Sequence, residues 1–170
     1  NVEQHFYSVA TADKRQAVRQ ILSQRALSQA LVFVNSKLGA ARLARSFERD
    51  GLKTTALHGD KSQDERLTAL DAFKRGEVDV LVATDVAARG LDVDGLDLVV
   101  NYDLPLDAES YVHRIGRTAR AGKSGKAITL ACEKFVYGLS AIERYIEGKI
   151  PTVAFDDSFL VEDKSSGMRF

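Results

Sequence analysis

Three short polar segments follow directly after runs of apolar residues, and each carries groups that could bind an anion. They are Asn35-Ser36-Lys37, His58-Gly59-Asp60-Lys61-Ser62 and Thr84-Asp85. Any one of them alone is more often a simple helix cap. In an open sheet of parallel strands, however, such segments gather at one edge, where helix N-termini present free N–H groups. Together the three segments predict an anion-binding edge.

Two arginines form a second feature suited to anions. Arg117 and Arg120 are three residues apart, so one helical turn would bring them to the same side. The guanidinium group is a rigid fork of donors that matches phosphate oxygens. Although a charged run is most often a solvated face, this pair makes a polyphosphate contact a serious candidate.

No phosphate-binding P-loop accompanies these arginines. Gly122-Lys123-Ser124 resembles the end of one, but five residues instead of four separate it from Gly116. It also leads into a strand-like run, whereas a P-loop opens a helix. Asp85 follows a strand in the manner of a Mg²⁺-binding carboxylate, but it has no second acid beside it. The chain therefore has arginines that could contact a nucleotide, but no phosphate-binding loop that could hold one.

The charges are segregated along the chain. The formal net charge is zero, with 24 Lys and Arg against 24 Asp and Glu, which argues against a histone-like nucleic-acid binder. Residues 90–109, however, carry six carboxylates and no Lys or Arg, and residues 110–132 carry five Lys or Arg and no carboxylate. The neutral total is thus a cancellation of two blocks and does not exclude nucleic acid as a partner.

Alternating strand and helix patterns must position these groups. Continuously apolar runs, such as Leu31–Val34, are typical of strands buried on both faces of a parallel sheet. The alternation predicts an α/β fold with a doubly wound, mainly parallel sheet and helices on both faces. The predicted strands are Gln4–Val9, Ala30–Val34, Thr54–Leu57, Val78–Ala83, Leu98–Tyr102 and Lys126–Ala131. The predicted helices are Ala12–Gln24, Lys37–Asp50, Gln63–Lys74, Ala108–Gly116 and Lys134–Glu147.

Length and composition limit the alternatives further. A chain of 170 residues predicts one domain, and its single cysteine, Cys132, excludes an internal disulfide and a cysteine zinc cluster. The three histidines have no metal-ligand spacing, so no metal site is predicted. Because there is no signal peptide and every apolar run is too short for a bilayer, we expect a cytoplasmic protein without membrane association.

Four motifs occur in an order that resembles a known family. They are Leu31-Val32-Phe33-Val34-Asn35-Ser36, His58-Gly59 with Gln63-x-x-Arg66, Ala83-Thr84-Asp85-Val86-Ala87-Ala88-Arg89-Gly90-Leu91-Asp92, and His113-Arg114-Ile115-Gly116-Arg117-Thr118-Ala119-Arg120. The chain resembles the second, C-terminal RecA-like domain of a DEAD-box ATP-dependent RNA helicase, in the bacterial style. The resemblance predicts a helicase domain over residues 1–152 and an acidic, flexible tail or linker over 153–170.

On the nucleotide side, the resemblance implies that Arg117 and Arg120 act as arginine fingers toward the γ-phosphate of ATP. His113 would couple their helix to the facing domain, and Arg114 would form a structural ion pair. Asp92 would accept hydrogen bonds from the ribose hydroxyls, beside Gly90.

On the RNA side, the resemblance implies contacts to the phosphate backbone without base reading. The residues that it assigns to this role are Asn35, Ser36, Gly59, Gln63, Arg66 and Thr84.

The family's remaining motifs are absent from this chain. ATP and Mg²⁺ would be held mainly by a first, N-terminal RecA-like domain that is missing here, and the start at Asn1 rather than Met favours a piece of a longer protein. We therefore expect an enzyme that hydrolyses ATP to separate short RNA duplexes only as the full-length protein, with the isolated chain inactive.

Three other readings are open. The chain could be the equivalent domain of a DNA helicase or translocase, or a stand-alone RNA-binding module without an enzymatic partner. A receiver-like module with Asp85 or Asp92 as acceptor is a further possibility, but it explains neither arginine.

Overall fold

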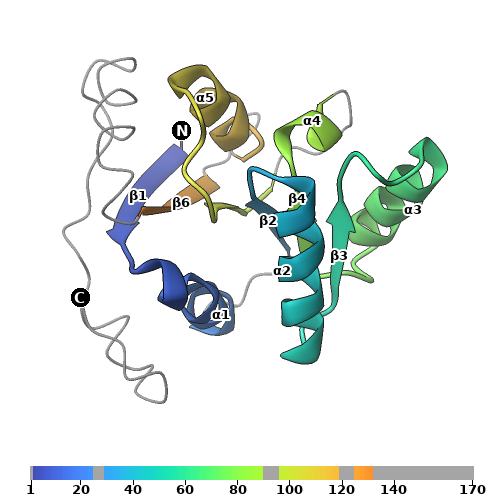
Figure 1. The fold of residues 1–170 in the computed structure, drawn as a ribbon, viewed down its shortest axis with the longest axis horizontal. Helices are drawn as coiled ribbons and strands as arrows, with labels where there is room; N and C mark the ends of the chain where they lie inside the picture. Colours follow the sequence, from blue (N-terminus) through green and yellow to red (C-terminus); the bar gives the residue numbers. More distant parts are fainter. Residues whose placement is uncertain (1, 25–28, 90–95, 119–124, 132–170) are drawn as a thin grey trace.

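A computed structural model of the chain describes residues 2–24, 29–89, 96–118 and 125–131 (Figure 1). Its centre is a six-stranded sheet in the order β1-β6-β5-β2-β4-β3, and every strand pair is parallel. The predicted doubly wound α/β class is confirmed. The strands are β1 Val2–Ser8, β2 Ala30–Phe33, β3 Thr54–Leu57, β4 Val80–Ala83, β5 Leu98–Asn101 and β6 Gly125–Ala131. The helices are α1 Lys14–Gln24, α2 Lys37–Arg49, α3 Gln63–Lys74, α4 Asp85–Ala88 and α5 Ala108–Ile115, and a 3-10 turn at Thr11–Asp13 precedes α1.

The central strands are buried on both faces, as their almost wholly apolar sequences predict. Every residue of β2, β4 and β5 is buried. In β2, Val32 is in register with Val82 of β4 and with Val100 of β5, so three β-branched side chains lie side by side across the sheet. This burial explains why β2, β4 and β5 show no alternation of polar and apolar residues.

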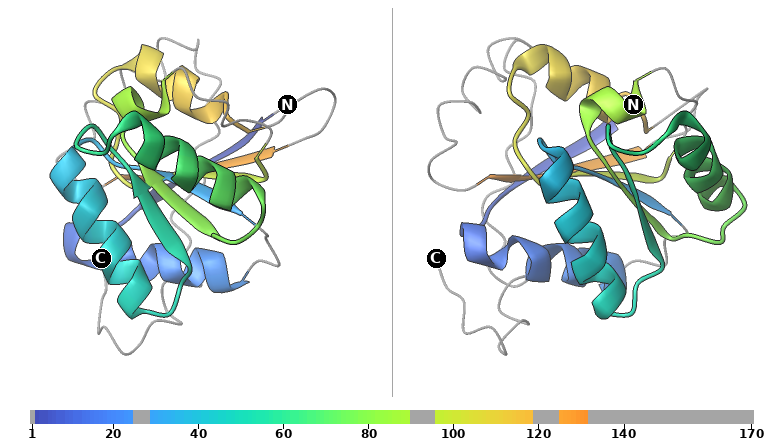
Figure 2. Two further views of the ribbon diagram at one scale, coloured as in Figure 1. Left: turned by 90° about the vertical axis from the view of Figure 1, so that its right-hand side faces the viewer. Right: turned by 45° about the vertical axis from the view of Figure 1, so that its right-hand side comes forward.

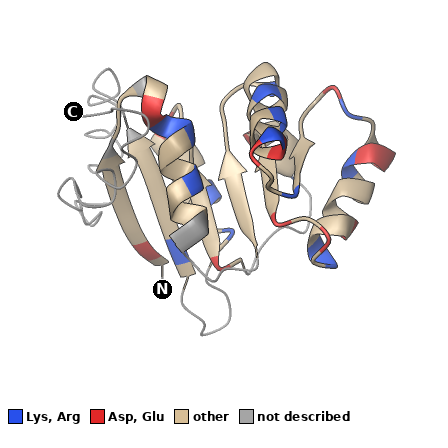
Figure 3. Ribbon diagram, turned by 90° about the horizontal axis from the view of Figure 1, so that it is seen from below, with Lys and Arg blue, Asp and Glu red and all other residues tan. Residues whose placement is uncertain are grey.

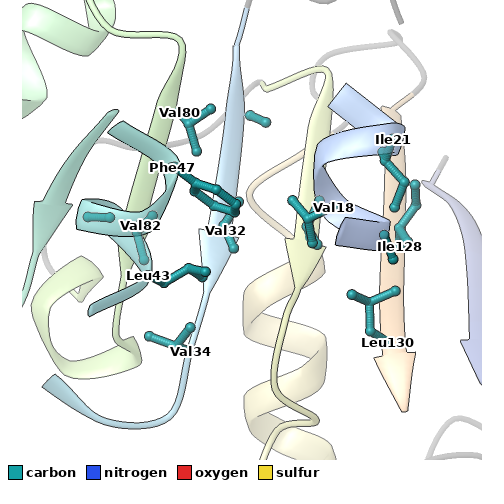
Figure 4. Packing of buried hydrophobic residues seen from close by; sticks show 14 of the residues in the cluster. Val18, Ile21, Val32, Val34, Leu43, Phe47, Val80, Val82, Ile128 and Leu130 are labelled. Atoms are coloured by element: carbon teal, nitrogen blue, oxygen red, sulfur yellow. The ribbon is translucent and has the colours of Figure 1, made fainter. Parts of the chain in front are cut away.

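Successive strand residues point to opposite faces, and each face has its own helices (Figure 2). On one face, Val18 of α1 and Phe47 of α2 pack against even-numbered residues of β2 and β4, such as Val32 (Figure 4). On the other face, Phe73 of α3 and Ala87 of α4 pack against odd-numbered residues of the same strands. The two helical layers therefore flank the sheet on both sides.

The ends of α2 and α3 are set by local sequence. Ser62 accepts a hydrogen bond from the Glu65 backbone N–H, and Glu65 accepts one in return from the Ser62 N–H, so the two residues form a capping box at the start of α3. A glycine follows the C-terminal end of each of these two helices. Gly51 and Gly76 have φ angles of 92° and 79°, in the left-handed region where glycine carries no Cβ penalty.

Predicted and observed elements agree in type wherever both can be compared. The main differences are the 3-10 turn before α1 and the four-residue helix α4, which is too short to produce a helical periodicity. The predicted helix Lys134–Glu147, Cys132 and the predicted tail 153–170 lie outside the described residues. Within the described part, no helix is long and apolar enough to cross a membrane, and no group of three or more His, Cys, Asp or Glu could hold a metal ion.

Candidate functional site

The polar segments identified in the sequence lie at one edge of the sheet. Since β2, β4 and β3 are consecutive, parallel strands, the segments that follow them are neighbours at their carboxyl ends. The Lys37 ammonium at the start of α2 lies 3.0 Å from the Asp60 carboxylate in the loop after β3. This edge therefore brings together the predicted phosphate-binding segments.

Arg114 of α5 joins this edge to α4. Its side chain is fully buried, and its Nε and Nη2 donate to the two carboxylate oxygens of Asp85 at 2.9 and 2.8 Å. Such a two-point contact fixes the orientation of both groups. The predicted role of Arg114 as a structural ion-pair former is confirmed.

The same guanidinium also reaches the ends of β2 and β5. Nη2 donates to Asn35 Oδ1 at 2.6 Å, and Nη1 donates to the Asp103 carbonyl at 2.8 Å. The guanidinium carbon lies 5.1 Å from the centre of the Phe33 ring, close enough for a cation–π contact. Arg114 thus connects α5, α4 and the segments after β2 and β5 through one buried group.

A pocket of about 330 Å³ opens beside Arg114, between α4 and α5. His113 and Arg117, both predicted from sequence to act on a nucleotide, line it together. The Arg117 guanidinium donates to the Ala88 carbonyl at 3.3 Å, which anchors it to the end of α4. The full lining is Phe33, Asp85, Ala88, Arg89, Ser110, His113, Arg114 and Arg117. With three arginines and one paired carboxylate, this pocket suits an anionic ligand.

The predicted RNA-binding residues after β2 and β4 have structural partners within the chain. Asn35 donates to the Leu104 carbonyl at 3.0 Å in addition to accepting from Arg114. Ser36 caps α2 by accepting from the Gly39 N–H, and buried Thr84 caps α4 by accepting from the Ala87 N–H. These side chains therefore shape the helix N-termini at the edge.

The predicted RNA-binding residues after β3 are more open. Gly59 is exposed, and a Cβ placed on it would meet no atom within 4 Å, so the chain itself does not require glycine there. Gln63 is exposed at the start of α3, and its Oε1 accepts from Arg66 Nη2 at 2.9 Å. The Gly59 position leaves room for an external backbone to approach.

Burial and local hydrogen bonds set the charge of two groups at this edge. Burial, together with the positive charge of Lys61, lowers the pKa of His58 below its ordinary 6.5. The Ser62 N–H donates to the Glu65 carboxylate and lowers the pKa of that group. Glu65 is therefore ionised at neutral pH, and its carboxylate is engaged in the hydrogen bond to Ser62.

Some candidates lie beyond the described part, and sequence reasoning missed others. Gly90, Asp92 and Arg120 lie outside the described residues. Arg89 and Ser110 line the pocket without having been singled out, and Asp103 was counted only as one carboxylate of an acidic block. Asp103 accepts from the Asn35 N–H at 2.9 Å. Only the adjacency of β2 and β5 reveals this contact, and no local pattern signals it.

Comparisons with known proteins agree with this geometry. Residues 13–122 match the family described as helicase conserved C-terminal domain. The chain is 49% identical over 150 residues to the ATP-dependent RNA helicase RhlB of Xanthomonas axonopodis pv. citri (strain 306), covering 88% of this chain and 26% of that protein. It is 41% identical over 162 residues to RhlB of Shewanella amazonensis (strain ATCC BAA-1098 / SB2B), covering 95% and 37%. The chain thus spans only 26% and 37% of the length of these relatives.

Solved structures give the same result. The E. coli DEAD-box protein SrmB, in a crystal structure with regulator of ribonuclease activity A, superimposes with a TM-score of 0.84 at 34% identity, covering 92% of each chain. S. cerevisiae Dbp5 bound to RNA and ADP BeF3 superimposes with a TM-score of 0.81 at 33% identity, covering 97% of this chain and 44% of Dbp5. Both neighbours share the fold described above.

Proposed function

This chain belongs to the helicase conserved C-terminal domains and is the second RecA-like domain of a bacterial DEAD-box RNA helicase, and from that premise we propose that it completes an ATP site held mainly by another domain. The observation that carries the proposal is the pocket between α4 and α5, where His113 and Arg117 lie together at the edge that also carries the RNA-side segments. A domain with arginines and no P-loop is suited to contribute charge to a bound nucleotide and not to hold it alone.

The pocket residues fit the phosphates of ATP but not its metal ion. Arg117, with Arg120 beyond it in the sequence, would contact the γ-phosphate, and His113 would contact the facing domain. Gly90 and Asp92 would approach the ribose. Asp85 is already bound to Arg114, and the described residues hold no cluster of metal ligands, so Mg²⁺ would be held by the missing domain.

The chemical contribution of this domain is charge stabilisation. Hydrolysis of ATP builds negative charge on the transferred phosphoryl group, and a guanidinium placed there by a facing domain accelerates such reactions by about 10³ to 10⁵. The Ala88 carbonyl orients Arg117 before the domains close. Such preorganisation removes the cost of ordering the side chain during the reaction.

The same edge would bind RNA through its backbone. The N-termini of α2 and α3, with Asn35, Ser36, Gly59, Gln63, Arg66 and Thr84 around them, offer N–H groups and side-chain donors to phosphates. None of these groups is arranged to read a base, so the binding would be independent of sequence. Closure of the cleft on ATP and RNA together would bend the strand and separate a short duplex.

An ATPase assay tests this proposal. The 170-residue chain alone should hydrolyse no ATP, with or without RNA, whereas the full-length protein should show RNA-stimulated turnover. Turnover by the isolated chain would contradict the two-domain site. Stimulation by single-stranded DNA equal to that by RNA would favour a DNA translocase instead.

A further inference from the structure

The solvent-facing side of α2 carries a row of arginines that the proposed ATP and RNA sites do not use. Arg42, Arg45 and Arg49 are all exposed and follow one another at intervals of three and four residues, so they share one side of the helix. That side is opposite the core residues Leu43 and Phe47. We call this row the α2 ridge; Figure 3 shows the Lys and Arg positions of α2 in blue.

The charge of the α2 ridge is largely uncompensated. In the described part of the chain, neither Arg42 nor Arg45 has an ion-pair or hydrogen-bond partner, and Arg49 contacts only the Ser46 hydroxyl. The one carboxylate within α2 is Glu48. Asp50, at the end of the helix, is already paired with two arginines of α1. An arginine row that has no internal partner is free to bind an external anion.

A second pocket connects the α2 ridge to the RNA edge. Its volume is about 220 Å³, and its charged and titratable lining residues are Arg45 and Glu48 from α2, with His58 and Lys61 from the loop that contains Gly59. His58 is only 8% exposed, and its Nδ1 faces the Asp60 N–H at 3.3 Å. Its other ring nitrogen has no partner among the described residues, so it remains available as a donor. The donors of this pocket bridge the gap between the edge and the helix.

We propose that the α2 ridge and this pocket bind a further stretch of RNA phosphate backbone, continuing the strand that the sheet edge holds. The inference rests on the proposed RNA binding at that edge. The helix of 13 residues spans about 20 Å, with one arginine at nearly every turn from Arg42 onward, which suits a ligand of evenly repeated charge. A protein partner would need apolar anchors at the centre of the contact, and between Arg42 and Arg49 this side of α2 offers none.

Equilibrium binding of labelled single-stranded RNA to the 170-residue chain tests the ridge. Oligonucleotides of about 6 and about 20 nucleotides distinguish binding at the sheet edge from binding that continues onto the α2 ridge, because only the longer one could reach α2. Removing two phosphate contacts should lower the salt dependence of binding by about 1.4 in slope, since each contact on a single strand contributes about 0.7. The test variant is Arg45→Gln/Arg49→Gln, and Lys74→Gln/Arg75→Gln at the end of α3 is a charge-matched control.

We expect the ridge variant to weaken binding of the longer RNA about tenfold and to leave the shorter RNA unchanged. The α3 control should change neither. If the ridge variant binds the longer RNA as the unmodified chain does, or if the α3 control loses as much, the ridge is not an RNA surface, and the edge proposal stands. Absence of binding to either length overturns both. Stronger binding of polyglutamate than of the longer RNA would assign the ridge to an acidic protein instead.

Discussion

The buried Arg114 guanidinium donates two hydrogen bonds to the Asp85 carboxylate, at 2.9 and 2.8 Å, and so connects α5 to the first residue of α4. The two residues are 29 positions apart in sequence. Because the Arg114 side chain has no solvent exposure, its charge depends on these partners for stabilisation.

Replacing Arg114 with methionine should therefore destabilise the domain strongly. The change leaves the partly buried Asp85 and Asn35 without their donor, and each polar group left without a partner typically costs about 1–3 kcal/mol. Urea unfolding followed by circular dichroism measures the loss. The exposed Arg75→Met is the control and should have little effect, because its pair with Glu77 lies in solvent. Equal stability of the two variants would mean that the Arg114 pair contributes nothing to the fold.

Arg117→Ala should abolish ATP turnover in the full-length protein without unfolding it. Loss of an arginine finger reduces kcat by about 10³-fold or more, while ATP binding, which the proposed function assigns mainly to the other domain, should change much less. Steady-state kinetics with saturating RNA and a thermal melt of the same sample give both quantities. An Arg117→Ala enzyme with normal kcat would remove this residue from the reaction.

Gly59→Ala should lower the RNA affinity of the domain without lowering its free energy of unfolding. No atom lies within 4 Å of the added Cβ and the backbone is outside the left-handed region, so the fold should be unaffected or slightly more stable. RNA affinity should fall, because the methyl group occupies the space that a phosphate backbone would enter. Gly76→Ala is the reverse control. Its φ of 79° predicts a loss of about 1 kcal/mol in unfolding free energy with unchanged RNA affinity. Unchanged RNA binding by Gly59→Ala would argue against this contact.

His58 should make the stability of the domain sensitive to mild acid. Its pKa in the folded state lies below the ordinary 6.5, so below that pH the unfolded chain binds more protons than the folded one. The free energy of unfolding should then fall as pH drops below 6.5 and level off once the folded form is also protonated. The carboxyls with lowered pKa in the folded state, such as Glu65, titrate there below 4.5, which is outside the pH range in which His58 changes its charge.

Urea unfolding at several pH values between 7 and 5 measures this effect, with His58→Gln as the non-titrating comparison. The stability of the unmodified chain should decline relative to that of His58→Gln as the pH falls. Parallel pH profiles for the two proteins would show that burial of His58 has no such consequence.

Local sequence was sufficient for most of the elements. Unbroken apolar runs such as Leu31–Val34 predict buried strands because both faces of a parallel sheet are covered. Ser62 and Glu65 mark the start of α3 because a capping box satisfies its backbone donors within four residues. The motif residues His113 and Arg117 were likewise predicted together, since one helix and the turn after it carry both.

Tertiary structure decided which segments meet. The strand order places β2 between β4 and β5, and only this order brings Asn35, Asp85 and Asp103 around Arg114. Periodicity reports which face of an element is buried, but not which strand lies beside it, because strand neighbours are chosen by packing over the whole sheet. For the same reason Asp85, which the sequence offered as an imitation of a metal ligand, is instead the partner of a buried arginine.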